Sequence, residues 1–284
     1  MSLIDLIRNM FGQRQEPDDV TSKEIELWGD GIEDYNKLHR ELEFARAMGF
    51  EGTPAQGTLV FGRAERFWAL NPDFLMDGQS LHPVHVHVDY RKPLFPGEHV
   101  RWEFSDFADG HLDTYDLGRS CFVFIGKKLP TLQDAINVRV TIGTYILPMP
   151  PQKERDVRLY TDRKNITPEK LAMCNTALRR TNSDDIPFSV PAALPLSSLL
   201  TISKSEGLVS KFAVYPLGQP HLGPVDITLA IPPPKVLSEK LASILGKRFS
   251  YNIRATVTQD GLPISGLDIG CYSNTNFYDD QHPH

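Results

Sequence analysis

The sequence predicts an α+β protein in which one helix-and-sheet unit occurs twice. Helical periodicity comes early in the first half of the chain and is followed by segments that alternate with a period of two. This order is typical of helices laid on an antiparallel sheet. The same order of elements recurs, more faintly, in the second half. A chain of 284 residues is long enough for two units of about 130 residues, each with its own core.

Three segments are expected before the sheet of the first unit. Residues 21–29 alternate the apolar Ile25 and Leu27 with charged residues, which predicts a strand. Two helices are expected to follow, over residues 37–48 and 57–70, and the second is apolar enough to be a central, buried helix. The first helix is predicted from three signals. Asn36 is a good N-cap, Leu38, Leu42 and Ala45 form an apolar stripe, and Gly49 is a typical helix stop.

Alternating segments predict the strands of both units. The expected strands are residues 82–90, 100–107, 120–126 and 137–144 in the first unit and 227–231, 247–258 and 267–272 in the second. Helices over 168–180 and 191–203 are expected to precede the strands of the second unit.

Changes in composition divide the chain. The predicted parts are an N-terminal helical segment over residues 1–20, a first half over 21–148, a linker rich in proline and charge over 149–158, a second half over 159–276 and a tail over 277–284. An uncovered sheet edge in either half would favour pairing with the other half.

Composition and charge exclude some classes of protein. The formal net charge of −6 argues against a general nucleic-acid binder. No apolar run approaches the ~18 residues that a membrane span needs. The three cysteines, Cys121, Cys174 and Cys271, have neither zinc-site nor redox-motif spacing. They indicate buried thiols in a reducing compartment, so a cytoplasmic protein is expected.

A carboxylate and an imidazole flank the start of the helix predicted over 37–48. Asp34 lies in the preceding loop and His39 in the first turn, so the carboxylate can turn back toward the imidazole. Such a pair can hold a water molecule for general acid–base chemistry. The next helix starts near Gly57, where an amide without an intrahelical partner can polarise a carbonyl oxygen. Together these groups suit the addition of water to an α,β-unsaturated carbonyl, or its removal.

Two segments carry a resemblance to a known family. The pattern Asp-x-Asn-x-x-His over residues 34–39, followed by Ala45 and by Ala-Gln-Gly at 55–57, resembles the MaoC-like, R-specific enoyl-CoA hydratases. Residues 88–98 (VDYRKPLFPGE) are similar to that family's strand and the Pro-Gly-acid turn after it. The resemblance covers roughly residues 25–145.

The resemblance implies a hot-dog fold, in which a long helix is wrapped by an antiparallel sheet, and a double hot-dog in which one half keeps the catalytic motif. It implies that Asp34 and His39 share the catalytic water, that Asn36 orients their loop, and that Gly57, beside Gln56, binds the thioester oxygen through its amide. The implied reaction interconverts a trans-2-enoyl thioester and an (R)-3-hydroxyacyl thioester. The substrate would be carried by coenzyme A or by an acyl-carrier protein, and no metal or redox cofactor is needed.

Three residues depart from the family's motif: Glu33 stands in place of glycine, Lys37 in place of proline and Gln56 in place of histidine. These departures leave open a non-catalytic acyl-thioester binding protein. A hot-dog thioesterase, which uses a carboxylate to hydrolyse the thioester, is a further alternative. Residues 165–195 contain no histidine, so the second half is expected to be structural and to widen the acyl tunnel. The halves can pair within one chain, and two chains can assemble further as a homodimer.

Other polar residues have two interpretations each. His85 and His87 share one strand face and could bind a metal, but a half-exposed strand gives the same pattern, which we favour. Arg63 could mark the approach of a phosphate or an acyl chain, or it could lie on the surface of an amphipathic helix, which we also favour. Arg91 and Lys92 could meet the phosphates of coenzyme A or of a carrier protein.

Overall fold

The computed structural model describes residues 18–69, 75–76, 79–80, 82–106, 120–143, 156–180, 185–203, 207–276 and 278. The predicted N-terminal segment up to residue 17, most of the predicted linker and nearly all of the predicted tail lie outside these residues.

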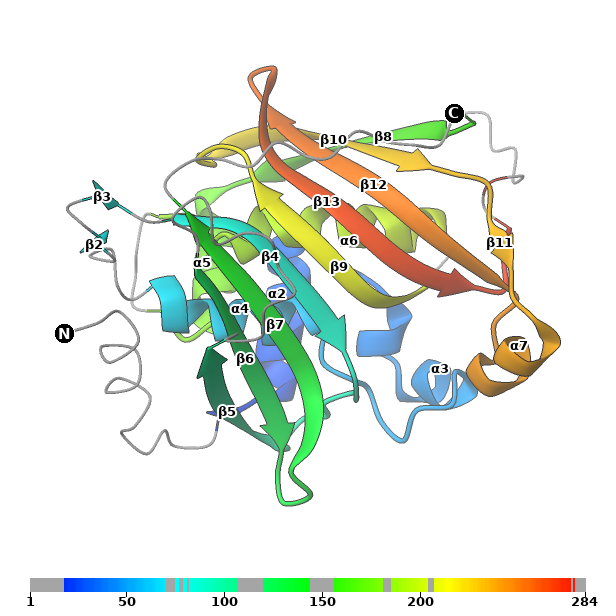
Figure 1. Cartoon of the computed structure of the whole chain (residues 1–284). Coiled ribbons are helices and arrows are strands. Elements are labelled where there is room, and N and C mark those ends of the chain that lie inside the picture. The colour runs from blue at the N-terminus through cyan, green and yellow to red at the C-terminus, as the bar shows by residue number, and fades with distance from the viewer. Residues whose placement is uncertain are drawn as a thin grey trace.

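The molecule is built around one curved antiparallel sheet (Figure 1). Its strands, in spatial order, are β1 (Asp18–Asp19), β5 (His99–Asp106), β6 (Ser120–Lys128), β7 (Gln133–Gly143), β4 (His82–Tyr90), β9 (Leu208–Pro216), β13 (Leu262–Ser273), β12 (Phe249–Gln259), β10 (Gly223–Ile231) and β8 (Arg158–Ile166). The short β11 (Lys235–Val236) pairs with β12, and β2 (Leu75–Met76) pairs with β3 (Gln79–Ser80) in a separate hairpin.

The two halves of the sheet have the same strand order. In the first half, β4 is followed outward by β7, β6, β5 and β1, and in the second half β9 is followed by β13, β12, β10 and β8. Each strand therefore has a counterpart at the same place in the other half. This confirms the predicted repetition of one α+β unit.

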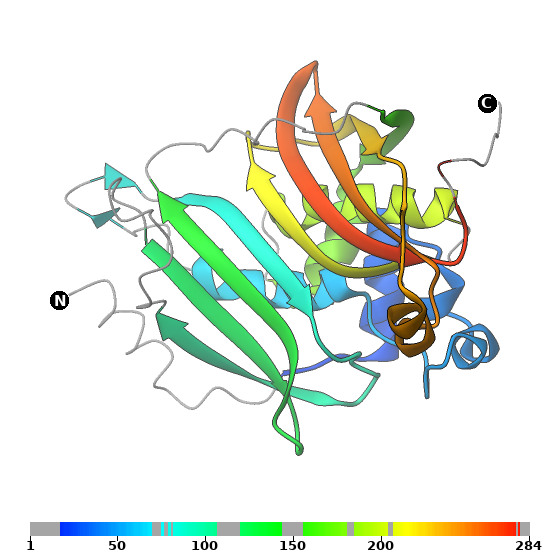
Figure 2. The ribbon, with the colours of Figure 1, turned by 45° about the vertical axis from the view of Figure 1, so that its right-hand side comes forward.

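The main helices lie on one side of the sheet (Figure 2). The helices are α2 (Ser22–Ile32), the 3₁₀ turn η1 (Lys37–His39), α3 (Leu42–Ala47), α4 (Gly57–Ala69), α5 (Pro168–Ala177), α6 (Ser189–Ile202) and α7 (Glu239–Leu245). Helices α4 and α6 are the long central helices of the two halves and contact each other, and α2 packs directly against α5. Among the described residues, no helix combines the length and the apolar character that a bilayer crossing requires.

The strand predicted over residues 21–29 is wrong, because this segment is helix α2. Thr21 and Glu24 form a capping box, in which each side chain accepts a hydrogen bond from the other residue's amide. Ile25, Trp28 and Ile32 are buried at helical spacing. The alternation of Ile25 and Leu27 with charged residues was misleading over so short a segment.

The single helix predicted over residues 37–48 is also wrong, because the chain forms η1 and then α3. The Asn36 N-cap is confirmed, since its side-chain oxygen accepts a hydrogen bond from the amide of Leu38 at 3.0 Å. The predicted stripe is broken at Leu42, which is 41% exposed. The predicted stop is confirmed, because Gly49 has a φ of +88° just after α3.

The remaining predicted helices and strands are present, with ends that differ by a few residues. Strands β8 and β9 and helix α7 were not predicted. Most residues of β8 are polar because it is the edge strand of the second half, and its first residue, Arg158, falls in the predicted linker. Strand β9 follows a segment outside the described residues. It carries one serine, one lysine and one tyrosine among its apolar residues, which obscures the alternation.

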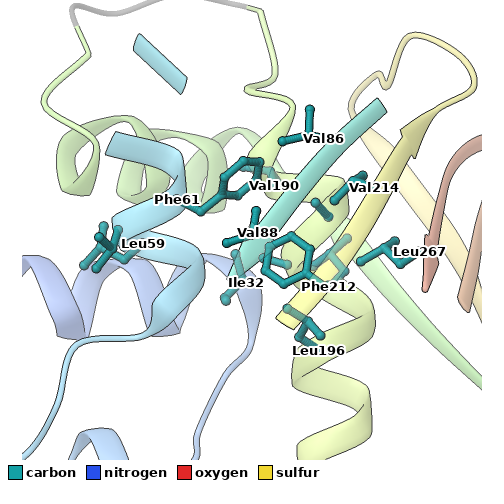
Figure 3. Packing of buried hydrophobic residues seen from close by; sticks show 14 of the residues in the cluster. Ile32, Leu59, Phe61, Val86, Val88, Val190, Leu196, Phe212, Val214 and Leu267 are labelled. Carbon is teal, nitrogen blue, oxygen red and sulfur yellow. The ribbon is translucent and has the colours of Figure 1, made fainter. Parts of the chain in front are cut away.

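The hydrophobic core is continuous across both halves (Figure 3). Phe61 of α4 meets Phe212 of β9 edge to face, with ring centroids 5.5 Å apart. Strands β4 and β9 pair directly, with Val86 opposite Val214 and Val88 opposite Phe212. Each of these two strands therefore covers the sheet edge of the other half. This is the pairing of the halves that we expected from their uncovered edges.

Two of the three cysteines are buried thiols, as predicted. Cys174 and Cys271 are free and buried, and burial raises the pKa of both thiols to about 12. The side chain of Cys121 lies outside the described residues.

Arg63 is neither on the surface nor at a ligand site, contrary to both interpretations. Its side chain is 1% exposed, and its guanidinium lies 2.9 Å from Asp18 and 2.8 Å from Glu24. It also donates a hydrogen bond to the carbonyl oxygen of Ala177, at the end of α5. Arg179, from the second half, binds the same carboxylates. This cluster ties the start of the chain and α4 to the second half.

We expect Arg63→Met to lower the free energy of unfolding by about 3 kcal/mol, because the carboxylates of Asp18 and Glu24 would stay buried with Arg179 as their remaining cation. Urea unfolding of the full chain measures this. Arg163→Met is the control, since Arg163 and Asp226 form an exposed pair and should change stability by less than about 0.5 kcal/mol. Equal losses in the two variants would contradict a special role for the buried pair.

Candidate active site

A cavity of about 400 Å³ opens at the start of α4, between the two halves. Asp34, Asn36, His39, Gln56 and Gly57 all line it. The structure therefore brings the five residues singled out from the sequence to one place, although they come from two segments separated by α3.

Asp34 and His39 face each other across this cavity. Their side chains are 5% and 10% exposed, and Asp34 Oδ2 lies 4.0 Å from His39 Nε2. This distance is too long for a direct hydrogen bond. A water molecule bound to both atoms would bridge the gap.

Local backbone geometry sets the direction of the Asp34 carboxylate. The Asp34 amide donates a hydrogen bond to the carbonyl oxygen of Gly29 at the end of α2. Asp34 Oδ1 then accepts a hydrogen bond from the amide of Asn36 at 3.0 Å, an Asx turn. Oδ2 is left to face His39.

The imidazole of His39 is held from its other side. Nδ1 lies 2.8 Å from the carbonyl oxygen of Pro54. Because a carbonyl oxygen only accepts, Nδ1 carries a proton and donates it in this bond. In the neutral ring, Nε2 then presents its lone pair toward Asp34 and the water between them.

The amide side chains of Asn36 and Gln56 are oriented by the backbone and keep one free group each. Asn36 uses its oxygen to cap η1, and Gln56 donates from Nε2 to the carbonyl oxygen of Ile25 at 3.1 Å. Asn36 Nδ2 and Gln56 Oε1 are buried without a hydrogen-bond partner in the described part of the chain. Unpaired buried polar atoms are uncommon in proteins, and here both belong to residues that line the cavity.

Gly57 is the first residue of α4, and its amide has no acceptor within the described ranges. Trp28 fixes this end of the helix by donating a hydrogen bond to the Thr58 hydroxyl at 2.9 Å. A side chain could not be accommodated at Gly57, because a Cβ there would lie 2.2 Å from Cζ of Tyr90. The helix start thus offers an unpaired N–H on the cavity that Asp34 and His39 also line.

The departure at Glu33 has a structural explanation. Glu33 ends α2 with a φ of +58°, a conformation that glycine adopts most easily. Its carboxylate pairs with Lys170 and lies 3.8 Å from Lys164, both from the second half. These ion pairs hold the loop that carries Asp34.

Lys164 is a charged neighbour of the site that the sequence did not indicate. It lies on β8, 7% exposed. Burial lowers the pKa of its ammonium, and the nearby carboxylates of Glu33, Asp162 and Asp34 partly oppose this. No motif places β8 beside Asp34, because the contact depends on how the halves dock.

The second half lines the apolar part of the cavity. Helix α6 contributes Ala193, Leu196 and Leu200, while Leu194 and Leu199 of the same helix are packed in the core. Helix α6 therefore both lines the cavity and packs in the hydrophobic core. Its sequence could not separate these two alternatives. Within the described residues, the second half adds no carboxylate and no imidazole to the lining.

His85 and His87 of β4 lie away from the cavity. Because Val86 and Val88 face the core, His85 and His87 point from the opposite face of the sheet. His85 stacks on Tyr215 with ring centroids 4.9 Å apart, and His87 Nε2 lies 3.4 Å from Asp89 Oδ1. In the part of the chain that the structure describes, no three His, Cys, Asp or Glu side chains are grouped so that they could hold a metal ion.

Comparison with solved structures decides the fold family. A protein from Chloroflexus aurantiacus J-10-fl, named as a MaoC domain protein dehydratase, matches with a TM-score of 0.70 at 9% identity, over 91% of this chain and 93% of that one. A conserved hypothetical protein from Mycobacterium tuberculosis with a double hotdog fold matches with a TM-score of 0.64 at 9% identity, over 92% and 97%.

This chain has a double hot-dog fold. A protein from Lactobacillus plantarum named as an oleoyl thioesterase shares the architecture, with a TM-score of 0.54 at 9% identity over 91% and 94% of the two chains. No family model and no curated protein matches the sequence. The double hot-dog fold expected from the two motifs is thus confirmed, and it is a fold that dehydratases and a thioesterase share.

In this double hot-dog, we expect Gly57→Ala to lower the free energy of unfolding by about 2 kcal/mol, because the new methyl group overlaps the Tyr90 ring. Thermal or urea unfolding tests this. Gly52→Ala, in the loop before α4, is the control, since its methyl group would meet the Phe95 ring at 3.3 Å and needs only a small adjustment. A Gly57→Ala variant as stable as the control would show that the ring of Tyr90 moves freely.

Proposed function

We propose that the protein interconverts a trans-2-enoyl thioester and an (R)-3-hydroxyacyl thioester, as a hydratase or dehydratase. The observation that supports this most directly is the placement of Asp34 Oδ2 and His39 Nε2, 4.0 Å apart on one buried cavity, beside the unpaired amide of Gly57. The motif resemblance and the dehydratases among the structural neighbours agree with it.

In the proposed hydration, Asp34 and His39 hold one water molecule between them. The water oxygen forms a bond to C3 of the enoyl group as one of its protons passes to the pair. The electrons of the C2–C3 double bond move toward the thioester carbonyl, whose oxygen gains negative charge next to the Gly57 N–H. C2 then takes a proton from the pair, which ends with as many protons as it had at the start. Dehydration follows the same steps in reverse.

The proposed acyl chain lies along α6. Ala193, Leu196 and Leu200 give the cavity an apolar wall that would bury it. At the rim, Arg91 and Lys92 are exposed and are available for the phosphates of coenzyme A or of a carrier protein. In this scheme, residues 21–148 supply the chemistry and residues 159–276 supply the apolar wall.

We expect Asp34→Asn and His39→Ala each to reduce crotonyl-CoA hydration by about 10²–10⁴-fold. Asp34→Asn keeps the side-chain oxygen that accepts from Asn36, so the loop should be preserved. The measurement is the decrease in absorbance of the enoyl thioester, with thiol release followed in parallel. Asp30→Asn is the matched control, because Asp30 is on the surface and pairs with Arg40 outside the cavity.

The outcomes separate the three candidate functions. Hydration by the wild type and by Asp30→Asn but not by the two site variants supports the proposal. Thiol release that depends on Asp34 would identify a thioesterase. Tight thioester binding with neither reaction would identify a binding protein, and slow hydration that is equal in all variants would overturn the catalytic assignment.

We expect Leu200→Phe to lower activity on long-chain enoyl thioesters at least tenfold relative to crotonyl-CoA, because the larger side chain would fill part of the apolar space that holds the acyl chain. Comparing kcat/KM across chain lengths measures this. Leu241→Phe, on the exposed face of α7, is the control and should leave the ratio unchanged. An equal loss at all chain lengths would place the acyl chain elsewhere.

A further inference from the structure

A third polar side-chain atom of the cavity is unpaired, and the sequence motifs gave it no role. Tyr90 is the last residue of β4 and lines the cavity. Its hydroxyl oxygen is inaccessible to solvent and has no hydrogen-bond partner among the residues that the structure describes. A buried hydroxyl without a partner costs roughly 1–3 kcal/mol, so an arrangement that keeps one calls for an explanation.

The position of this hydroxyl is closely defined. A Cβ built on Gly57 would lie 2.6 Å from the Tyr90 oxygen, so the hydroxyl sits directly beside the first residue of α4. The ring also packs on Phe212, with centroids 5.9 Å apart. Immediately after it, the amides of Arg91 and Lys92 both donate to the carbonyl oxygen of Ala135, which anchors the end of the strand.

The hydroxyl is suited to donate a hydrogen bond. Burial raises the pKa of Tyr90 well above 10, so the group keeps its proton at any pH at which the protein would work. Among the described residues of the lining, Asn36 Nδ2 is the other unpaired side-chain donor, but it belongs to the loop that carries Asp34, whereas Tyr90 lies next to the helix start.

We propose that the Tyr90 hydroxyl is a second hydrogen-bond donor to the thioester carbonyl oxygen, acting together with the amide of Gly57. The inference rests on the proposed function only in assuming that a thioester carbonyl binds at the start of α4. It holds equally for hydration and for hydrolysis, because both place negative charge on that oxygen.

Two donors fixed before the substrate arrives stabilise the developing charge without reorganisation. The bound thioester in turn supplies the acceptor that the hydroxyl lacks in the free protein. Removing the hydroxyl should therefore have opposite effects on catalysis and on the stability of the free protein.

Tyr90→Phe tests this, because it keeps the ring that packs on Gly57 and Phe212. We expect kcat for crotonyl-CoA to fall by about 10²-fold with KM changed less than threefold. The unfolding midpoint of the free protein should stay the same or rise. Tyr215→Phe is the matched control, since Tyr215 lies on the outer face of the sheet against His85, and it should leave kcat unchanged.

A binding measurement makes the result independent of the reaction. Calorimetry would compare butyryl-CoA with S-butyl-CoA, a thioether that lacks the carbonyl oxygen. The wild type should prefer the thioester, and Tyr90→Phe should reduce that preference about fivefold. If the wild type does not hydrate crotonyl-CoA but keeps a Tyr90-dependent preference, the proposed reaction fails and the role of Tyr90 stands. Three results would overturn the role of Tyr90. The first is an unchanged preference for the thioester in Tyr90→Phe, the second is an unchanged kcat in that variant, and the third is a wild type that binds the thioester and the thioether equally.

Discussion

The pairing of β4 with β9 is the constraint on which the rest of the structure depends. Each half ends its sheet on one of these strands, and an open edge there would leave a row of unpaired backbone groups. Their pairing makes the sheet continuous and brings α4 and α6 under it side by side, with Phe61 and Phe212 in contact across the junction. The cavity is the space that remains between the start of α4 and the wall of α6. Its shape therefore depends on the docking of the halves as much as on the loop that carries Asp34.

Within the described residues, the second half adds no carboxylate and no imidazole to the cavity lining, yet it supports the loop that carries Asp34. Its lysines Lys164 and Lys170 bind Glu33, which ends α2 and sets the path of the chain into Asp34. The first half also stabilises the second. The carboxylate of Glu65, on α4, accepts hydrogen bonds from the amides of Phe188 and Ser189 at the start of α6. Burial raises the pKa of Glu65, and these amide hydrogen bonds oppose that shift because they stabilise its carboxylate form.

The polar side chains of the cavity contrast with the buried charged groups farther along α4. Arg63 and Glu65 are as deeply buried, but they are engaged with carboxylates or amides of neighbouring elements. Around the start of α4, by contrast, Asn36, Gln56 and Tyr90 each keep a buried atom without a partner in the described structure. Groups that are paired stabilise the fold, whereas unpaired groups around one cavity are typical of a site whose partner is a ligand.

The sequence by itself determined the fold class, most of the strands and the residues of the candidate site. Local signals suffice for these, because Asp34, Asn36 and His39 lie within six consecutive residues and Gly57 begins a helix. It misplaced α2 because nine residues cannot separate a period of two from a helical face, and the capping box of Thr21 and Glu24 was the signal that would have done so. Only the tertiary structure decided the partners of Arg63, the approach of Lys164 to the Asp34 loop and the contact of Tyr90 with Gly57. These contacts join residues that are far apart in the chain, and their geometry is set by how the two halves of the sheet and the two central helices pack, which no local pattern records.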